Sequence, residues 1–220
     1  MNLARKITYV FLVIAMSCSM LHAQNVEWGF MPGLALTVPS KDGYSVVDMI
    51  DETYEQELNM HYTLFINLPL KNKWSLELQG GYTAYSFLVN AYYVPTRLVV
   101  LTKEHSSYRF VEFGVNVHYQ LLGGKNSLNL LGGLGLGSTV RSIEHHKHFY
   151  GDGQIQNISF NFRGHEPDVQ FNYQLGVQFM HDFDKYSIFI RPYYKHFTEE
   201  QFAIPFRRLS AYVLGVGIQF

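Results

Sequence analysis

The sequence has 220 residues, with 17 basic and 18 acidic side chains and a formal net charge of -1. This length allows one domain, or two small ones. The balanced charge excludes the strongly basic surface that nucleic-acid-binding proteins use, so we expect no nucleic acid partner. The chain contains 16 tyrosines, 17 phenylalanines and 18 glycines, and only 16% of its residues are charged. This composition favours strands with aromatic girdles over helices.

The first residues have the features of a secretory leader. MNLARK carries Arg5 and Lys6, ITYVFLVIAM is apolar, and SCSMLHAQ offers a small residue before Gln24. We therefore expect a signal peptide over residues 1–23 and one domain over residues 24–220. A transmembrane helix needs roughly 20 apolar residues, and no stretch here has a run of that length. Helical membrane proteins are thereby excluded.

The single cysteine, Cys18, lies inside this leader. Cleavage after Ala23 leaves a chain without thiols, so stability must then come from the fold itself. A competing interpretation makes residues 15–18 a lipoprotein processing site with Cys18 lipidated, although alanine at the first of these positions fits poorly. The sequence leaves both alternatives open.

Apolar residues recur at every second position along most of the remaining chain. The clearest stretch is LNMHYTLFINLPL, residues 58–70. Its apolar residues recur with a period of 2 and not 3.6, so they would not share one face of a helix. Comparable patterns cover residues 26–36, 74–86, 108–122, 127–140, 168–180, 186–196 and 212–220. The sequence therefore predicts eight strands long enough to cross a membrane.

The connections between these strands alternate in length. Those at 71–73, 123–126 and 181–185 are short, and those at 37–57, 87–107, 141–167 and 197–208 are long. Within the first long connection, apolar residues of 46–54 fall at helical spacing, which suggests a short surface helix. Because short and long connections alternate, we expect them at opposite ends of an antiparallel array.

The polar face of the strands decides which side meets solvent. A soluble barrel or sandwich, the alternative, would carry many lysines and acids there, but this face holds mainly Asn, Gln, Gly and Thr. It resembles a confined lumen, and an apolar exterior requires lipid, where a closed barrel satisfies every backbone hydrogen bond. We predict an all-β fold: an eight-stranded antiparallel up-and-down transmembrane β-barrel with short periplasmic turns and four long extracellular loops.

The leader ending in LHAQ, the eight alternating strands and the final GVGIQF resemble the small outer-membrane β-barrel proteins of Bacteroidota-type bacteria, called porin-family or PorT-like proteins. This resemblance implies a place in the outer membrane of a Gram-negative bacterium after signal-peptide cleavage, in contact with its lipid. It also implies that the outer-membrane assembly machinery reads the last strand. The residues that fit this signal are Tyr212, Leu214, Val216, Ile218 and Phe220.

The interior of so narrow a barrel is expected to hold paired charges. Eight strands enclose a space that side chains fill, and an unpaired buried charge costs several kcal/mol. The predicted polar network includes Glu77, Glu112, His118, Arg191 and Lys195. Our hypothesis is that the two cations pair with the two carboxylates, either as a structural plug or as a gate for small ions.

A third long connection contains IEHHKHFYGDG. We consider His145, His146 and His148 as candidate zinc or copper ligands, with a hydrated histidine-rich loop as the alternative. No other cofactor is expected. No catalytic triad is recognisable, and His61 is followed two residues later by Thr63 where lipid deacylase barrels carry serine, so we expect no enzyme.

The function expected from these features is a non-enzymatic role in the envelope, performed by a monomer through its surface loops. It comprises adhesion, structural support, or docking of an envelope or secretion-system protein, and a PorT-like role is one member of this class. The alternatives are a small ion or solute channel and, third, a lipid-modifying enzyme.

Overall fold

The computed structural model describes residues 26–39, 49–93, 99–163, 169–200 and 208–220. The strands are β1 (Glu27–Pro39), β2 (Met49–Gln56), β3 (Leu58–Pro69), β4 (Trp74–Tyr93), β5 (Val99–Leu122), β6 (Asn126–Tyr150), β7 (Ile155–Arg163), β8 (Val169–Asp182), β9 (Ser187–Glu200) and β10 (Arg208–Gln219). The predicted signal peptide, and Cys18 with it, lies outside the described residues. In the described part of the chain, no helix is long and apolar enough to cross a membrane.

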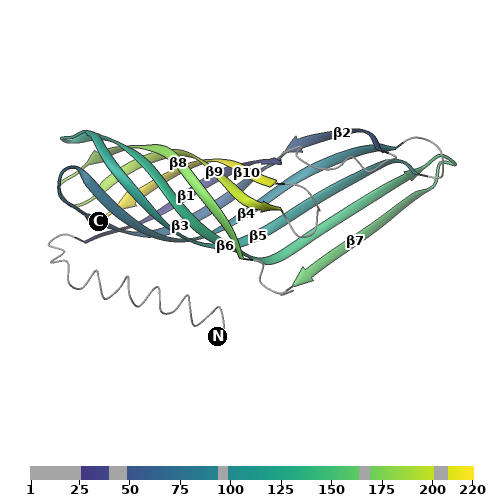
Figure 1. Ribbon diagram of the computed structural model, residues 1–220, viewed down its shortest axis with the longest axis horizontal. Helices are drawn as coiled ribbons and strands as arrows, with labels where there is room; N and C mark the ends of the chain where they lie inside the picture. Colours follow the sequence, from purple (N-terminus) through teal and green to yellow (C-terminus); the bar gives the residue numbers. More distant parts are fainter. Residues whose placement is uncertain (1–25, 40–48, 94–98, 164–168, 201–207) are drawn as a thin grey trace.

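Eight of these strands close into a ring, visible as the twisted bundle in Figure 1. Going around the ring, the order is β1, β10, β9, β8, β6, β5, β4 and β3, which pairs again with β1, and every pairing is antiparallel. Both described chain ends lie at the end with the short turns (Figure 1). The predicted eight-stranded up-and-down barrel is therefore confirmed.

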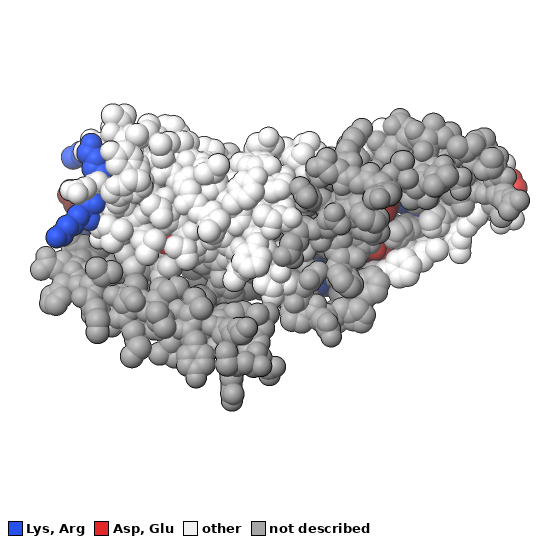
Figure 2. All heavy atoms as spheres, in the orientation of Figure 1, with Lys and Arg blue, Asp and Glu red and all other residues white. Residues whose placement is uncertain are grey.

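The two faces of the barrel wall differ as the alternation predicts. Leu134 and Leu175 on the outside are 71% and 59% exposed, whereas Phe65 on the inside is buried. Lys and Arg side chains gather at the short-turn end in Figure 2, and the visible barrel wall is nearly free of charge. Soluble monomers rarely expose apolar surface on this scale. The wall is therefore suited to contact with lipid.

Aromatic side chains form a girdle at the short-turn end. The stacked or tilted ring pairs are Trp28 with Phe220, Trp74 with Tyr119, and Phe183 with Tyr186, with centroids 4.8, 4.7 and 4.9 Å apart. Rings of this kind combine an apolar body with a polar edge, and they concentrate where a membrane meets water. The girdle marks one boundary of the apolar band.

At the other end, β4, β5 and β6 continue past the ring and form a projecting sheet (Figure 1). In this sheet β2 pairs with the last residues of β4, β4 with β5, β5 with β6, and β7 with the last residues of β6. We call these five paired segments the sheet extension. The predicted long connections at 87–107 and 141–167 are therefore largely strand.

The surface helix predicted for the first long connection is wrong in its described part. Residues 49–56 form β2, whose backbone pairs with β4 from Gln56 opposite Phe87 to Met49 opposite Tyr93. Helical spacing in so short a segment is a weak preference, and the open edge of β4 supplies backbone partners that override it.

The ring closes between the first and the last strand. The Trp28 N–H donates to the Phe220 carbonyl (3.1 Å), and the Phe220 N–H donates to the Trp28 carbonyl (2.9 Å). The expected outward face of β10 is present, since Tyr212, Leu214 and Val216 are exposed. Recognition of this strand by the assembly machinery stays a prediction.

We predict that Phe220→Ala lowers the stability of the closed barrel by about 1 kcal/mol, because the ring stacked on Trp28 is lost while the two backbone hydrogen bonds remain. The measurement is the temperature at which half of the protein loses its compact, heat-modifiable migration on gels. Phe179→Ala, at an outward position of β8, is the matched control. Equal midpoints for the two variants would show that the Trp28 contact does not stabilise closure.

Candidate functional site

The lumen is crossed by a buried ion pair near its short-turn end. Arg191 of β9 donates from Nη1 and Nη2 to the two carboxylate oxygens of Glu77 on β4, at 2.8 and 2.5 Å, and both residues are 1% exposed. Arg191 Nε also donates to Gln178 of β8 at 2.8 Å. The guanidinium lies over the rings of Phe65 and Phe189, 5.3 and 5.0 Å from their centroids. Hydrogen-bond acceptors and aromatic ring faces therefore surround the guanidinium of Arg191.

A second ion pair lies further toward the sheet extension. Lys195 of β9 donates to Glu112 of β5, and the Tyr85 hydroxyl donates to the other oxygen of the same carboxylate at 2.7 Å. Between the two pairs lies His61, whose Nε2 is 2.8 Å from the Tyr193 hydroxyl. These are the pairs that our hypothesis proposed for the two cations.

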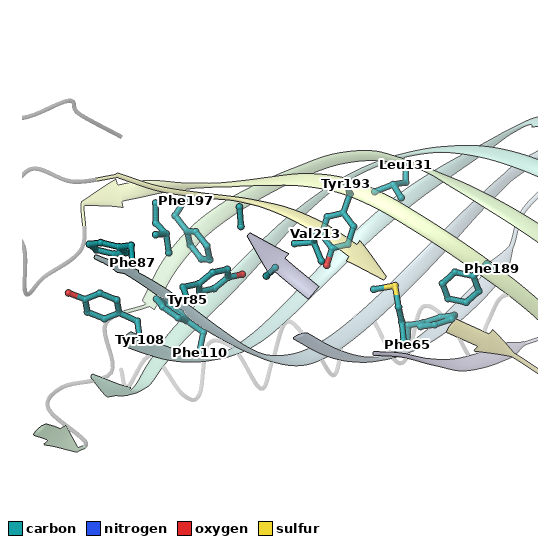
Figure 3. Packing of buried hydrophobic residues seen from close by; sticks show 14 of the residues in the cluster. Phe65, Tyr85, Phe87, Tyr108, Phe110, Leu131, Phe189, Tyr193, Phe197 and Val213 are labelled. Atoms are coloured by element: carbon teal, nitrogen blue, oxygen red, sulfur yellow. The ribbon is translucent and has the colours of Figure 1, made fainter. Parts of the chain in front are cut away.

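Apolar rings fill the space around the charges. Tyr85, Phe110 and Phe197 pack with centroids 5.3 to 5.5 Å apart. Figure 3 shows this group at one end of the buried cluster and Phe65 with Phe189 at the other. Layers of rings and paired charges therefore succeed one another along the lumen, as the narrow interior of an eight-stranded barrel requires. This packing favours a structural plug.

The short-turn mouth of the lumen holds a polar well of about 280 Å³, lined in part by Glu27, Lys73, Glu77, His118 and Gln178. His118 is buried, and its Nε2 lies 3.5 Å from Glu77 without a hydrogen bond among the described residues. Glu77 and Gln178 both hold Arg191. The predicted residue His118 therefore lies beside the Glu77–Arg191 ion pair, on the side of the short-turn mouth.

The three candidate metal ligands do not form one site. His146 and His148 lie on the same side of β6 with ring centroids 6.1 Å apart. His145 lies on the opposite side, stacked on His105 and 2.9 Å from the Ser159 hydroxyl. The segment is a strand, in which successive side chains alternate between faces. Within the described ranges, no three His, Cys, Asp or Glu side chains are grouped to hold a metal.

Two acidic neighbours of His146 were missed from the sequence. Its ring nitrogens lie 3.9 Å from Glu104 and 3.5 Å from Glu144. Burial, and then the charge of His146, lower the pKa of His148 below its ordinary value. Glu144, His146 and His148 share one parity, so the period-2 pattern could have found them. From the sequence, we place this segment in a long connection and consider only its histidines, so the acidic residue of the same parity is left out.

Several solved structures are similar to this chain, all at low sequence identity. No protein-family model matches the sequence, and no curated protein matches it. Among solved structures, Neisserial surface protein A is similar over 88% of this chain and 95% of its own, with a TM-score of 0.47 and 10% identity. Ail, the attachment invasion locus protein of Yersinia pestis, matches over 89% and 99%, with a TM-score of 0.40 and 18% identity.

A third similar structure corrects one expectation. The outer membrane protease OmpT from Escherichia coli matches over 90% of this chain and 97% of its own, with a TM-score of 0.46 and 10% identity. The prediction that the chain is not an enzyme was wrong as an exclusion, because one of the similar structures is a protease. In a barrel, side chains far apart in sequence meet across paired strands, so motifs of neighbouring residues do not decide whether a catalytic group is present.

We predict that Glu77→Gln lowers the free energy of unfolding by about 3–5 kcal/mol, because Arg191 would remain as a buried cation without its counter-charge. Adding Arg191→Met to the same chain should recover most of the loss, since no buried charge is then left. Urea unfolding followed by tryptophan fluorescence measures both effects. Asp184→Asn, at an exposed acid in a short turn, is the control. A double variant as unstable as the single one would contradict the ion-pair explanation.

We also predict that the purified protein shows no single-channel current steps in a planar bilayer. Arg191→Ala should behave in the same way, because the second ion pair and the aromatic layer around Phe110 still fill the lumen. Steps in the wild-type protein that change in size in Arg191→Ala would favour the gate over the plug.

Proposed function

We propose that the protein is an outer-membrane β-barrel that binds a partner protein through the sheet extension. The apolar wall and the aromatic girdle support the membrane placement, since only a closed barrel or a helix satisfies its backbone hydrogen bonds in lipid. The sheet extension lies beyond the ring, at the end opposite the girdle (Figure 1). In an outer membrane this end faces the cell exterior.

The observation that carries the proposal is the edge of β7. This strand of nine residues pairs with β6 on one side, and no strand of the described chain pairs with its other side. Free edges are normally protected by charges or proline. The β7 sequence IQNISFNFR has neither before its last residue, and Ile155 is 53% exposed. By contrast, the sequence of β2, at the other side of the sheet extension, contains three acidic residues.

An unprotected edge suits a partner that supplies an extended segment. Such a segment adds a strand, so that main-chain hydrogen bonds give affinity and alternate side chains give specificity. Adhesion to another cell and docking of an envelope component are both forms of this activity. A PorT-like role in a secretion system, as the sequence resemblance implies, would make the partner a component of that system.

The test places two acids on the β7 edge in the double variant Asn157→Asp, Ser159→Asp. These positions lie opposite Lys147 and His145 of β6, so the fold should tolerate the new charges. A photo-crosslinking amino acid at Tyr150, next to β7, reports the partner in intact cells. We expect about a tenfold loss of the crosslinked species, since acids on an edge disfavour strand addition.

The matched control adds the same charge to the other side of the sheet extension, in Thr53→Asp, Gln56→Asp. Both residues are exposed on β2. We expect this variant to crosslink like the wild type. Equal crosslinking by the β7 and β2 variants, or a crosslink that forms from Tyr54 and not from Tyr150, would refute docking at β7.

A further inference from the structure

An apolar groove of about 590 Å³ runs across the outer face of the ring. We call it the wall groove. Its lining comes from β1, β3, β8, β9 and β10 and includes Leu36, Leu58, Leu175, Pro192, Tyr212 and Leu214. The strand register places these side chains in adjoining rows, with Leu214 opposite both Leu34 and Pro192. The groove is therefore a continuous feature of the wall and not a gap between loops.

The hollow has a local cause in β9. Pro192 has no N–H to donate, and the ladder between β8 and β9 is interrupted there. Paired positions run from Asn172 opposite Phe197 to Gly176 opposite Tyr193, and they resume only at Phe179 opposite Ile190. The short proline ring also stands lower than the leucine and tyrosine side chains of the neighbouring strands. Pro192 and Val177, on the two sides of this interruption, both line the wall groove.

A polar cluster borders the wall groove on the side of the sheet extension. Ser210 of β10 lies opposite His196 of β9, and its Oγ is 2.8 Å from His196 Nδ1. The Tyr194 hydroxyl donates to the same oxygen at 2.9 Å, and Tyr194 also lines the groove. Beyond Tyr194 and Tyr212, the outward positions toward the short-turn end are Pro192 and Ile190 on β9 and Leu214 and Val216 on β10, which are all apolar. Hydrogen-bonding groups therefore begin where the apolar band of the wall ends.

We infer that the wall groove binds one lipid acyl chain, with the ester region of that lipid at the polar cluster of Tyr194, His196 and Ser210. The groove opens outward in the apolar band, so its occupant must be apolar and embedded in the membrane. Its volume lies within the range of small-molecule sites, and an ester carbonyl is an acceptor at the depth where the polar groups begin. The inference rests on the membrane placement proposed above and is independent of docking at β7.

The experiment measures lipid binding by native mass spectrometry of the detergent-solubilised protein titrated with dioleoylphosphatidylglycerol. Val177→Phe fills the wall groove from β8, and Val117→Phe makes the same change at an exposed position of β5 outside it. We expect the one-to-one lipid adduct of Val177→Phe to form about tenfold more weakly, the effect of losing contact with roughly two methylene groups. Val117→Phe should bind like the wild type.

Two further variants keep the test decisive. Leu214→Trp fills the groove from β10, should Val177→Phe fail to show heat-modifiable migration. Tyr194→Phe removes the hydroxyl of the polar cluster that lies on a groove-lining residue, and it should weaken the adduct several-fold without filling the groove. Equal lipid retention by the groove-filling variants and Val117→Phe would overturn the inference. A wild-type dimer that dissociates in Val177→Phe would also overturn it, because a second copy of the chain would then occupy the groove. Crosslinking from Tyr150 should be unchanged in Val177→Phe, so failure here leaves the docking proposal untouched.

Discussion

The closure of β1 on β10 is the constraint on which the rest of the structure depends. In lipid, a backbone N–H or carbonyl without a partner costs several kcal/mol, so a sheet in the membrane must have no free edge. The hydrogen bonds between Trp28 and Phe220 extend this closure to the girdle. Once the ring is closed, strand alternation sends one set of side chains into a narrow lumen and the other set outward.

The closed ring explains why the interior contains both charges and rings. A lumen of eight strands has room for side chains but little for water, so each polar group needs a partner within the wall. Arg191 has five N–H donors, and Glu77 and Gln178 together accept four hydrogen bonds from it. The faces of Phe65 and Phe189 cover the remainder of the cation. Such an interior stabilises one arrangement of the strands. Binding of other molecules is therefore expected at the outer surfaces and not in the lumen.

The fold could be predicted because alternation is a local property of the sequence. The stretch predicted at 58–70 corresponds to β3, Leu58–Pro69, and the lumen charges followed from parity alone. The prediction ended β4 near residue 86 because Phe87, Leu88 and Val89 are all apolar and break the pattern, although the strand continues to Tyr93. What could not be predicted depends on register between strands. His196 and Ser210 are 14 residues apart and meet only because β9 and β10 pair.

The need to satisfy backbone hydrogen bonds also distinguishes the wall of the ring from the strand edges of the sheet extension. In the ring, closure leaves no strand edge without a partner. A ligand can therefore contact only the side chains of the wall, where the interruption at Pro192 forms a groove. Beyond the ring, water can satisfy the backbone, so an edge is tolerated and its sequence decides whether it invites another strand. The sequence of β2 contains acids, whereas β7 presents Asn157, Ile158 and Ser159 without charge. Because β5 and β6 continue past the ring and β6 pairs there with β7, the sheet extension contains a strand edge outside the closed barrel, and the proposal of partner binding rests on this edge.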